Sequence, residues 1–129
     1  MTIRLSGGAL PQIASRASVP NYRRDGLSPG IFHFGVGNFH RAHQAVYLDA
    51  LFNLGEGHDW AIVGSGVRAA DEAMREKLKA QDWLTTVVEQ EAEGSSARVT
   101  GAMIDYIRPG DATGILEKLA DPAIRIVSL

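Results

Sequence analysis

The chain has 129 residues, 45% of them hydrophobic and 22% charged, which is enough for one globular domain with its own core. Its formal net charge of −2 gives no reason to expect nucleic acid or an anionic membrane as a partner. No apolar run approaches the roughly 20 residues that span a bilayer. The first residues carry no signal-peptide pattern and there is no cysteine, so we expect a cytoplasmic protein without disulfides or thiolate zinc sites.

The first half of the chain alternates strand and helix patterns after an irregular N-terminal arm. The arm, residues 1–30, is rich in Gly, Ser, Pro and Arg, and we expect one helical turn in it near Ala9–Ser15. A strand is expected at Ile31–Phe34 and a helix at Ala42–Leu54, which ends at a glycine. Two more elements of the same kinds follow, a strand at Trp60–Val63 and a helix at Ala70–Gln81.

The second half adds a hairpin and a final helix and strand. The hairpin is predicted from a strand at Trp83–Glu89, a turn within residues 91–96 and a second arm at Ala97–Ile107. Asp111 is placed to cap a helix that runs to Ala120. The apolar residues of Ala123–Leu129 predict a buried strand at the end.

Strands that alternate with helices of this length indicate βαβ units. We therefore expect an α/β fold, a Rossmann-type, doubly wound and mostly parallel sheet with an inserted β-hairpin. An apolar strand with nothing after it to cover its neighbours seldom closes a natural domain. For this reason we expect a longer protein, in which residues 31–129 form the N-terminal part of a dinucleotide-binding domain.

The first candidate site is the glycine pair that follows the first strand. Gly35 and Gly37 stand between that strand and a helical stretch, where backbone N–H groups can approach a pyrophosphate. The third glycine of the usual pattern is replaced by His40, so the fingerprint is incomplete. A tight turn that binds nothing is the alternative interpretation.

A second glycine pair follows the second strand and competes with the first. Gly64, Gly66 and Ala69 give the better formal spacing, and Glu89 lies at about the expected distance further on. The two loops can also act together, because loops at the carboxyl ends of adjacent parallel strands border one crevice. In that arrangement the first loop holds the pyrophosphate and the second the adenosine ribose.

Asp71 is the acid that this arrangement places at the ribose. A carboxylate beyond the second strand accepts bonds from ribose hydroxyls and repels a 2′-phosphate, which favours NAD over NADP. Arg68 works in the opposite direction, since a guanidinium can pair with a 2′-phosphate. The alternative for Asp71 is an acidic residue that only stabilises a helix N-terminus.

Basic groups are concentrated where the expected helix begins. Such groups oppose the helix dipole, which favours Arg41 as a ligand of a pyrophosphate or carboxylate over a solvated arginine. His40 and His43 could instead begin a metal site, although no third ligand is identifiable. His33 fits a hydrogen-bonded core histidine better than a catalyst, and His58 fits a surface loop.

The run after the first strand resembles the N-terminal signature of the long-chain mannitol dehydrogenase family of polyol-specific dehydrogenases. It reads Gly35-Val36-Gly37-Asn38-Phe39-His40-Arg41-Ala42-His43-Gln44-Ala45 and continues through Tyr47, Asp49 and Ala50. Further matches are Gly55-Glu56-Gly57, Asp59-Trp60, Gly64-x-Gly66-x-Arg68, Gln81-Asp82 and Ile124-Arg125-Ile126-Val127-Ser128-Leu129. The likeness therefore covers the chain from about Gly30 onward.

The resemblance implies a metal-independent, NAD-dependent oxidoreductase that transfers a hydride between a small polyol and a ketose, typically D-mannitol and D-fructose. Fructuronate reductase and arabinitol dehydrogenase are near relatives with the same first motif. The resemblance also implies that the first glycine loop holds the pyrophosphate and Asp71 the ribose. The residues expected at NAD are Gly35, Val36, Gly37, Asn38, Phe39, His40, Arg41, Arg68 and Asp71.

The resemblance also limits what these residues can do. The family's catalytic lysine, with its asparagine and histidine helpers, lies well beyond residue 129, so we expect cofactor binding without turnover from this chain alone. Ala70 stands where family members can carry a second acid, which weakens the expected discrimination against NADP. A non-catalytic nucleotide-binding module is the alternative function, and the sequence gives no indication of the oligomeric state.

Overall fold

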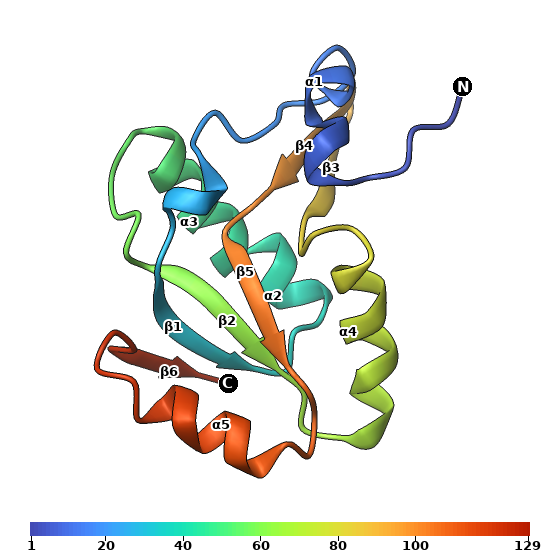
Figure 1. The fold of residues 1–129 in the computed structure, drawn as a ribbon. Coiled ribbons are helices and arrows are strands. Elements are labelled where there is room, and N and C mark those ends of the chain that lie inside the picture. The colour runs from blue at the N-terminus through green and yellow to red at the C-terminus, as the bar shows by residue number, and fades with distance from the viewer.

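Four parallel strands form the sheet at the centre of the chain (Figure 1). The computed structural model describes residues 1–129. The strands are β1 (Pro29–Phe34), β2 (Ala61–Ser65), β5 (Met103–Ile107) and β6 (Ile126–Ser128), in the order β5-β2-β1-β6. Because β2 and β5 lie on one side of β1 and β6 on the other, the order reverses at β1, as in a doubly wound Rossmann-type sheet. The predicted fold class is confirmed.

Helices cover both faces of this sheet. They are α2 (Asn38–Ala42), α3 (Gln44–Asn53), α4 (Glu72–Lys79) and α5 (Ala112–Leu119). In Figure 1, α2 and α3 lie on one side of the strands and α5 on the other, as right-handed crossovers in opposite directions require. Asp111 caps α5 as predicted, since its Oδ1 accepts from the Gly114 N–H at 3.0 Å.

The first helix differs from the single segment predicted at Ala42–Leu54. It begins at Asn38 and is interrupted at His43, whose φ and ψ of −123° and −85° lie outside the helical region. The His43 N–H bonds to the His40 carbonyl, while its ring Nδ1 lies 2.8 Å from the Phe39 carbonyl oxygen. The ring thus supplies the hydrogen bond that a continuous helix would take from the backbone.

The second helix is also shorter than the predicted Ala70–Gln81. A 3-10 turn at Ala69–Asp71 precedes α4, which ends at Lys79. Asp82 and Trp83 then adopt positive φ values of 55° and 63°, and the Trp83 N–H bonds back to the Leu78 carbonyl. This left-handed turn ends the helix and delays the next strand, predicted from Trp83, to Thr85.

The hairpin consists of β3 (Thr85–Glu91) and β4 (Gly94–Thr100), with a tighter turn than predicted. Its predicted second arm, Ala97–Ile107, is wrong as one strand: the chain leaves the hairpin at Gly101 and enters the main sheet as β5. A Cβ at Gly101 would lie 2.8 Å from Arg24 Nε, so the change of direction depends on close packing with the arm.

The last strand is shorter and more exposed than the buried strand predicted at Ala123–Leu129. It covers three residues, and the Ile126 and Val127 side chains are 45% and 54% exposed. The reason is its position at the sheet edge, where β1 is its only partner.

The N-terminal arm contains 3-10 turns at Gly7–Ala9 and Arg24–Gly26 and one short helix, α1 (Leu10–Ile13), where a helical turn was expected. It is tied to the rest of the chain at several points. The Gly7 N–H bonds to Asp82, and Ser18 forms a parallel bridge with Arg98 of β4.

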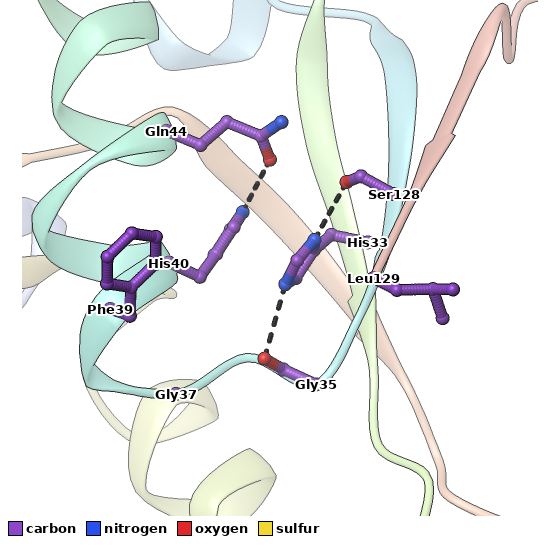
Figure 2. A pocket seen from close by; sticks show the side chains of 8 residues that line it. All are labelled: His33, Gly35, Gly37, Phe39, His40, Gln44, Ser128 and Leu129. Atoms are coloured by element: carbon purple, nitrogen blue, oxygen red, sulfur yellow. Dashed lines mark hydrogen bonds between the residues drawn. The ribbon is translucent and has the colours of Figure 1, made fainter.

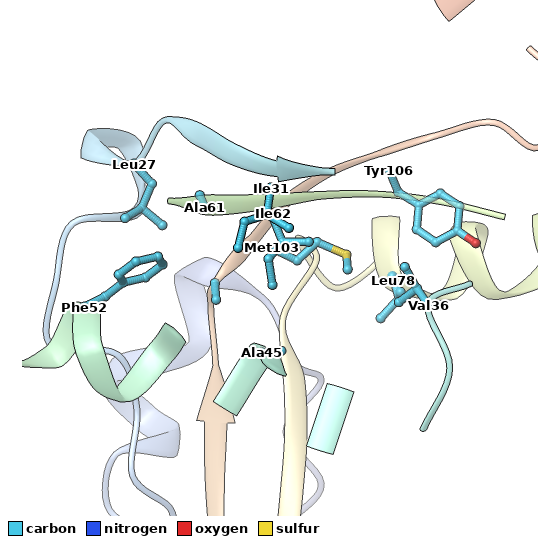
Figure 3. Close-up of a cluster of buried hydrophobic side chains, with 11 residues drawn as sticks. Leu27, Ile31, Val36, Ala45, Phe52, Ala61, Ile62, Leu78, Met103 and Tyr106 are labelled. Carbon is cyan, nitrogen blue, oxygen red and sulfur yellow. The ribbon is translucent and has the colours of Figure 1, made fainter. Parts of the chain in front are cut away.

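The main core lies between the sheet and the α3 and α4 side. Figure 3 shows Ile31 and Ile62 of the strands facing Phe52 and Ala45 of α3. Strand alternation places His33 on the same face as Ile31, and therefore toward α2. Phe32 is fully buried on the opposite face. No helix of the structure is both long and apolar enough to span a bilayer.

Candidate functional site

The bend after β1 has its backbone open to solvent-filled space. Gly35 adopts a φ of +86°, and its N–H bonds to the Ser65 carbonyl of β2 at 2.8 Å. The N–H groups of Val36 and Gly37 donate to no backbone carbonyl. A Cβ on Gly35 would meet nothing within 4 Å and one on Gly37 only the Gly35 oxygen at 4.0 Å, so side chains there would fill this space.

Val36 points the other way, into the core, and explains the first glycine of the second pair, Gly64. A Cβ at Gly64 would lie 2.6 Å from Val36 Cγ2, and one at Gly66 would lie 2.4 Å from the Asp71 Cβ. Gly64 therefore makes room for the first bend and Gly66 for the acid. Close packing, of Gly64 against Val36 and of Gly66 against Asp71, therefore accounts for both glycines of the second pair.

The two loops meet at a cavity of about 200 Å³ at the carboxyl ends of β1 and β2. Its lining residues are Gly35, Val36, Gly37, Val67, Arg68 and Asp71. Asp71 Oδ2 accepts from the N–H groups of Arg68 and Val67, both at 2.9 Å. These two bonds lower the pKa of Asp71 below its ordinary value, and the bond from Arg68 has the larger effect. The Asp71 carboxylate is therefore charged at neutral pH.

Asp71 has the structural role that its sequence position allows, and only one of its two oxygens is used for it. One oxygen binds the backbone at the start of the 3-10 turn. The other, Oδ1, has only the Arg68 Nη2 at 3.4 Å, and the Arg68 side chain is 81% exposed. The carboxylate therefore keeps acceptor capacity at the cavity, and an arginine stands beside it.

Arg41 binds the loop that it follows. Its Nε donates to the Gly37 carbonyl at 3.2 Å and its Nη2 to Asn38 Oδ1 at 2.6 Å. These bonds keep the guanidinium beside the bend. Phe39, the next residue of the motif, is 78% exposed.

A second cavity of about 370 Å³ lies on the other side of the same bend, between the carboxyl ends of β1 and β6 (Figure 2). This is where the strand order reverses, the position at which doubly wound sheets bind ligands. Its lining residues are His33, Gly35, Gly37, Phe39, His40, Gln44, Ser128 and Leu129. Gly35 and Gly37 line both cavities.

Two stacked imidazoles form part of the wall of this second cavity. The rings of His33 and His40 lie 3.7 Å apart with an angle of 11° between their planes. His33 Nε2 donates to the Gly35 carbonyl at 3.2 Å, and its Nδ1 lies 2.7 Å from Ser128 Oγ, which donates to it. His33 is thus a buried, hydrogen-bonded histidine as predicted, although it also lines a cavity.

His40 is neutral in this setting. It is 5% exposed, and burial, with a smaller effect from His33, lowers its pKa to about 4. Burial also lowers the pKa of His33. The His40 Nε2 donates to Gln44 Oε1 at 2.7 Å, whereas its Nδ1 is buried without a partner.

Some histidine predictions change with the structure. His58, predicted on a loop surface, is half-buried, and its Nε2 lies 3.0 Å from the Phe52 carbonyl. His40 and His43 lie in no group of three or more His, Asp or Glu side chains that could hold a metal ion.

Sequence reasoning missed two residues at the second cavity, Gln44 and Ser128. Gln44 follows His40 by four positions, a spacing that places two residues on one helix face, and this was the available signal. Ser128 reaches the site only because β6 pairs with β1, which no local pattern reveals.

Comparisons with known proteins agree with this architecture. The sequence model described as the mannitol dehydrogenase Rossmann domain matches residues 29–129. The mannitol 2-dehydrogenase of Cereibacter sphaeroides is 60% identical over 111 residues, which are 85% of this chain and 23% of that relative. A polyol:NADP oxidoreductase of Gluconobacter oxydans is 45% identical over 93% of this chain and 25% of its own length.

The fold is also similar to a solved structure. The Pseudomonas fluorescens mannitol 2-dehydrogenase, in a ternary complex with NAD and D-mannitol, superposes with a TM-score of 0.91 at 44% identity. The match covers 98% of this chain and 26% of that one. The chain therefore spans about a quarter of the length of the relatives that it matches.

Proposed function

The chain belongs to the mannitol dehydrogenase family, and from this premise we propose that it binds NAD across the bend between β1 and α2. The observation that carries the proposal is the meeting of an open glycine backbone with a charged aspartate at one cavity. A dinucleotide needs both features: N–H donors for its diphosphate and a carboxylate for its adenosine ribose.

Each motif residue has a role in this proposal. The N–H groups from Val36 to Phe39 hold the diphosphate, and Arg41, kept at the bend by its bonds to Gly37 and Asn38, adds positive charge. Asp71 accepts from the ribose hydroxyls through Oδ1. When bound, the nicotinamide ring of the cofactor supplies the hydride acceptor.

The reaction that we propose for the whole protein is the interconversion of a polyol and a ketose by hydride transfer, with D-mannitol and D-fructose as the pair. The support is the similarity to mannitol 2-dehydrogenases, one of which has been solved in a ternary complex with NAD and D-mannitol. These residues supply the cofactor site, and no group among them is proposed as the general acid or base.

The cofactor site can be tested by measuring the affinities of two variants, Asp71→Ala and Arg68→Ala, for NAD and for NADP. Replacing Asp71 by alanine removes a charged acceptor, so NAD binding should weaken about tenfold or more, while NADP binding should weaken less or improve. Arg68→Ala should leave NAD binding nearly unchanged and weaken NADP, which loses its pairing partner for the 2′-phosphate.

Isothermal titration of the full natural protein with each dinucleotide gives these values. Asp25→Ala, which removes an exposed carboxylate of the arm, serves as the matched control. Unchanged NAD affinity in Asp71→Ala would show that the assigned ribose contact is wrong.

A further inference from the structure

The hairpin of β3 and β4 is a two-stranded sheet whose two edges have different surroundings. The edge of β4 is occupied by the N-terminal arm: the Ser18 N–H donates to the Ala97 carbonyl at 3.0 Å, and the Val99 N–H donates to the Ser18 carbonyl at 2.7 Å. β3 pairs with β4 alone, so its other edge has no neighbouring strand. In Figure 1 the hairpin extends away from the parallel sheet.

The register of the hairpin identifies the free backbone groups of β3. Residues directly opposite each other in an antiparallel pair either bond to each other or both point outward. Ala97 and Val99 point outward, because they bond to the arm. Their partners across the hairpin, Val88 and Thr86, therefore also point outward, and strand alternation adds Gln90. These three residues of β3 are exposed, and each presents an N–H and a C=O group to solvent.

This edge has little of the protection that edge strands usually carry. Natural edges are short, or are blocked by proline, by a bulge, or by lysine and other charged side chains. β3 is seven residues long, contains neither proline nor lysine, and keeps an unbroken register with β4. Its only charged residues, Glu89 and Glu91, lie at the end next to the turn, whereas Thr85–Val88 are all β-branched. The edge is therefore suited to pairing with an extended chain.

A hollow of about 670 Å³ next to the edge provides space for a side chain of a paired strand. It is lined by Val88, by Ser95, Ser96 and Ala97 of β4, and by residues 14–18 of the arm. Val88, which is 55% exposed, thus belongs both to the free edge and to the hollow. The lining residues are mostly Ala and Ser, with one base from the arm, so an uncharged side chain suits the hollow better than a lysine.

The turn end of the hairpin is acidic. Glu89 and Glu91 of β3 and Glu93 of the turn form no ion pair. Arg98 is the only base of the hairpin, and it is bound to the buried Asp49. The complementary charge must therefore come from the partner, as lysine or arginine side chains near that end.

We propose that the free edge of β3 binds an extended protein segment by strand addition, through the outward backbone groups of Thr86, Val88 and Gln90. The segment has an uncharged side chain at the hollow and basic residues beside the glutamates. This surface is separate from the cofactor site, because no residue of the hairpin lines either cavity at the bend after β1.

Synthetic peptides of about nine residues, measured by fluorescence anisotropy with the full natural protein, provide the test. The first alternates lysine with valine and threonine. The second has glutamate in place of lysine. The third keeps the lysines but carries methyl groups on its three central backbone nitrogens, which removes the donors at both of its edges. We expect the first peptide to bind, and the other two to bind about tenfold more weakly or less.

Variants of the protein test the same two contributions. Val88→Pro removes an outward N–H that the pairing with β4 does not use, so binding of the lysine peptide should weaken about tenfold or more. Replacing Glu89 and Glu91 together by glutamine should weaken it about three- to tenfold and reduce its dependence on salt. Glu117→Gln, an exposed change on α5, is the matched control and should leave binding unchanged. The methylated peptide tests backbone pairing on the unmodified protein, so the result does not depend on how Val88→Pro folds.

Three results would overturn the proposal. Failure of the lysine peptide to bind would show that the edge is not available to a partner. Equal binding of the lysine peptide and its methylated form would mean attraction by charge alone, without strand addition. Dimerisation in sedimentation experiments that Val88→Pro abolishes would mean that a second copy of the protein, and not a basic segment, occupies the edge.

Discussion

His40 occupies the position at which the usual dinucleotide fingerprint has its third glycine. That glycine normally allows a close approach between the helix and the first strand. Here the imidazole lies between them instead, flat against His33 at 3.7 Å. The helix is thus held off the strand by the thickness of a ring, and the imidazole is held without charge by its burial.

This burial predicts a pH dependence of stability that a His40→Phe variant should lack. His40 titrates near 6.5 when unfolded and at about 4 when folded, so its neutral form is favoured by the fold. Stability is therefore full above pH 6.5 and falls as the pH drops toward 4, by on the order of 3 kcal/mol for this shift. His33, whose pKa is also lowered, acts in the same direction.

Urea unfolding at pH 7.5 and pH 4.5 measures the effect as the difference between the natural protein and the variant. Tyr47→Phe is the control, because Tyr47 is exposed and lies outside the stack on His33. The same loss of stability on acidification in the natural protein and in His40→Phe would contradict the expectation.

For single residues, the sequence predicts a structural role that depends on neighbouring residues in the chain. It does not predict a role that depends on contact with a residue far away in the sequence. The open bend at Gly35 and Gly37 follows from two neighbouring glycines after a strand. The role of Gly64 does not, because it is defined by Val36 on another strand-to-helix connection. Two similar glycine patterns in one sequence therefore have different physical causes.

At the scale of elements, β2 and the bend after β1 are fitted to each other. Gly64→Ala places a methyl group 2.6 Å from Val36 Cγ2 and 3.3 Å from Met103 Cε, so the buried Val36 side chain would have to shift. We expect a loss of about 1–3 kcal/mol of unfolding free energy from overpacking, and weaker NAD binding because Val36 belongs to the bend.

Chemical unfolding and NAD titration of the same variant check both parts. Gly8→Ala is the matched control, since a Cβ there meets nothing within 4 Å and its φ is not positive. A Gly64→Ala protein as stable as the natural one, with unchanged NAD affinity, would mean that the close packing of the two loops is unimportant.

The existence and order of the elements are predicted well from periodicity, but their ends are not. Strand and helix types are confirmed from β1 to β6, whereas the break at His43 depends on a side chain that replaces a backbone donor. The division of the hairpin arm at Gly101 depends on Arg24 and Asp49, which come from the arm and from α3. Neither cause belongs to the local pattern.

At the scale of the whole molecule, Asp49 joins parts that are distant in the sequence. It is 1% exposed and accepts from the Tyr22 hydroxyl of the arm, from Arg98 of β4 and from the Gly101 N–H. Burial, with the bond to Asp49, raises the pKa of Tyr22 well above its ordinary value, so that hydroxyl keeps its proton and donates. One carboxylate therefore ties the arm and the hairpin to α3.

Asp49→Ala should be the most damaging single change outside the cofactor site. It leaves Arg98, Tyr22 and the Gly101 N–H without their buried acceptor, which costs about 3–5 kcal/mol when one partner of a buried pair is removed. The loss should appear as a lower urea midpoint and as faster proteolysis of the arm.

Asp25→Ala is the control: it breaks an exposed ion pair of the arm, between side chains that are 86% and 69% exposed, and should change the free energy of unfolding by less than about 1 kcal/mol. If the arm of Asp49→Ala were as resistant to protease as that of Asp25→Ala, the arm must be held by its other contacts, such as the Gly7 bond to Asp82.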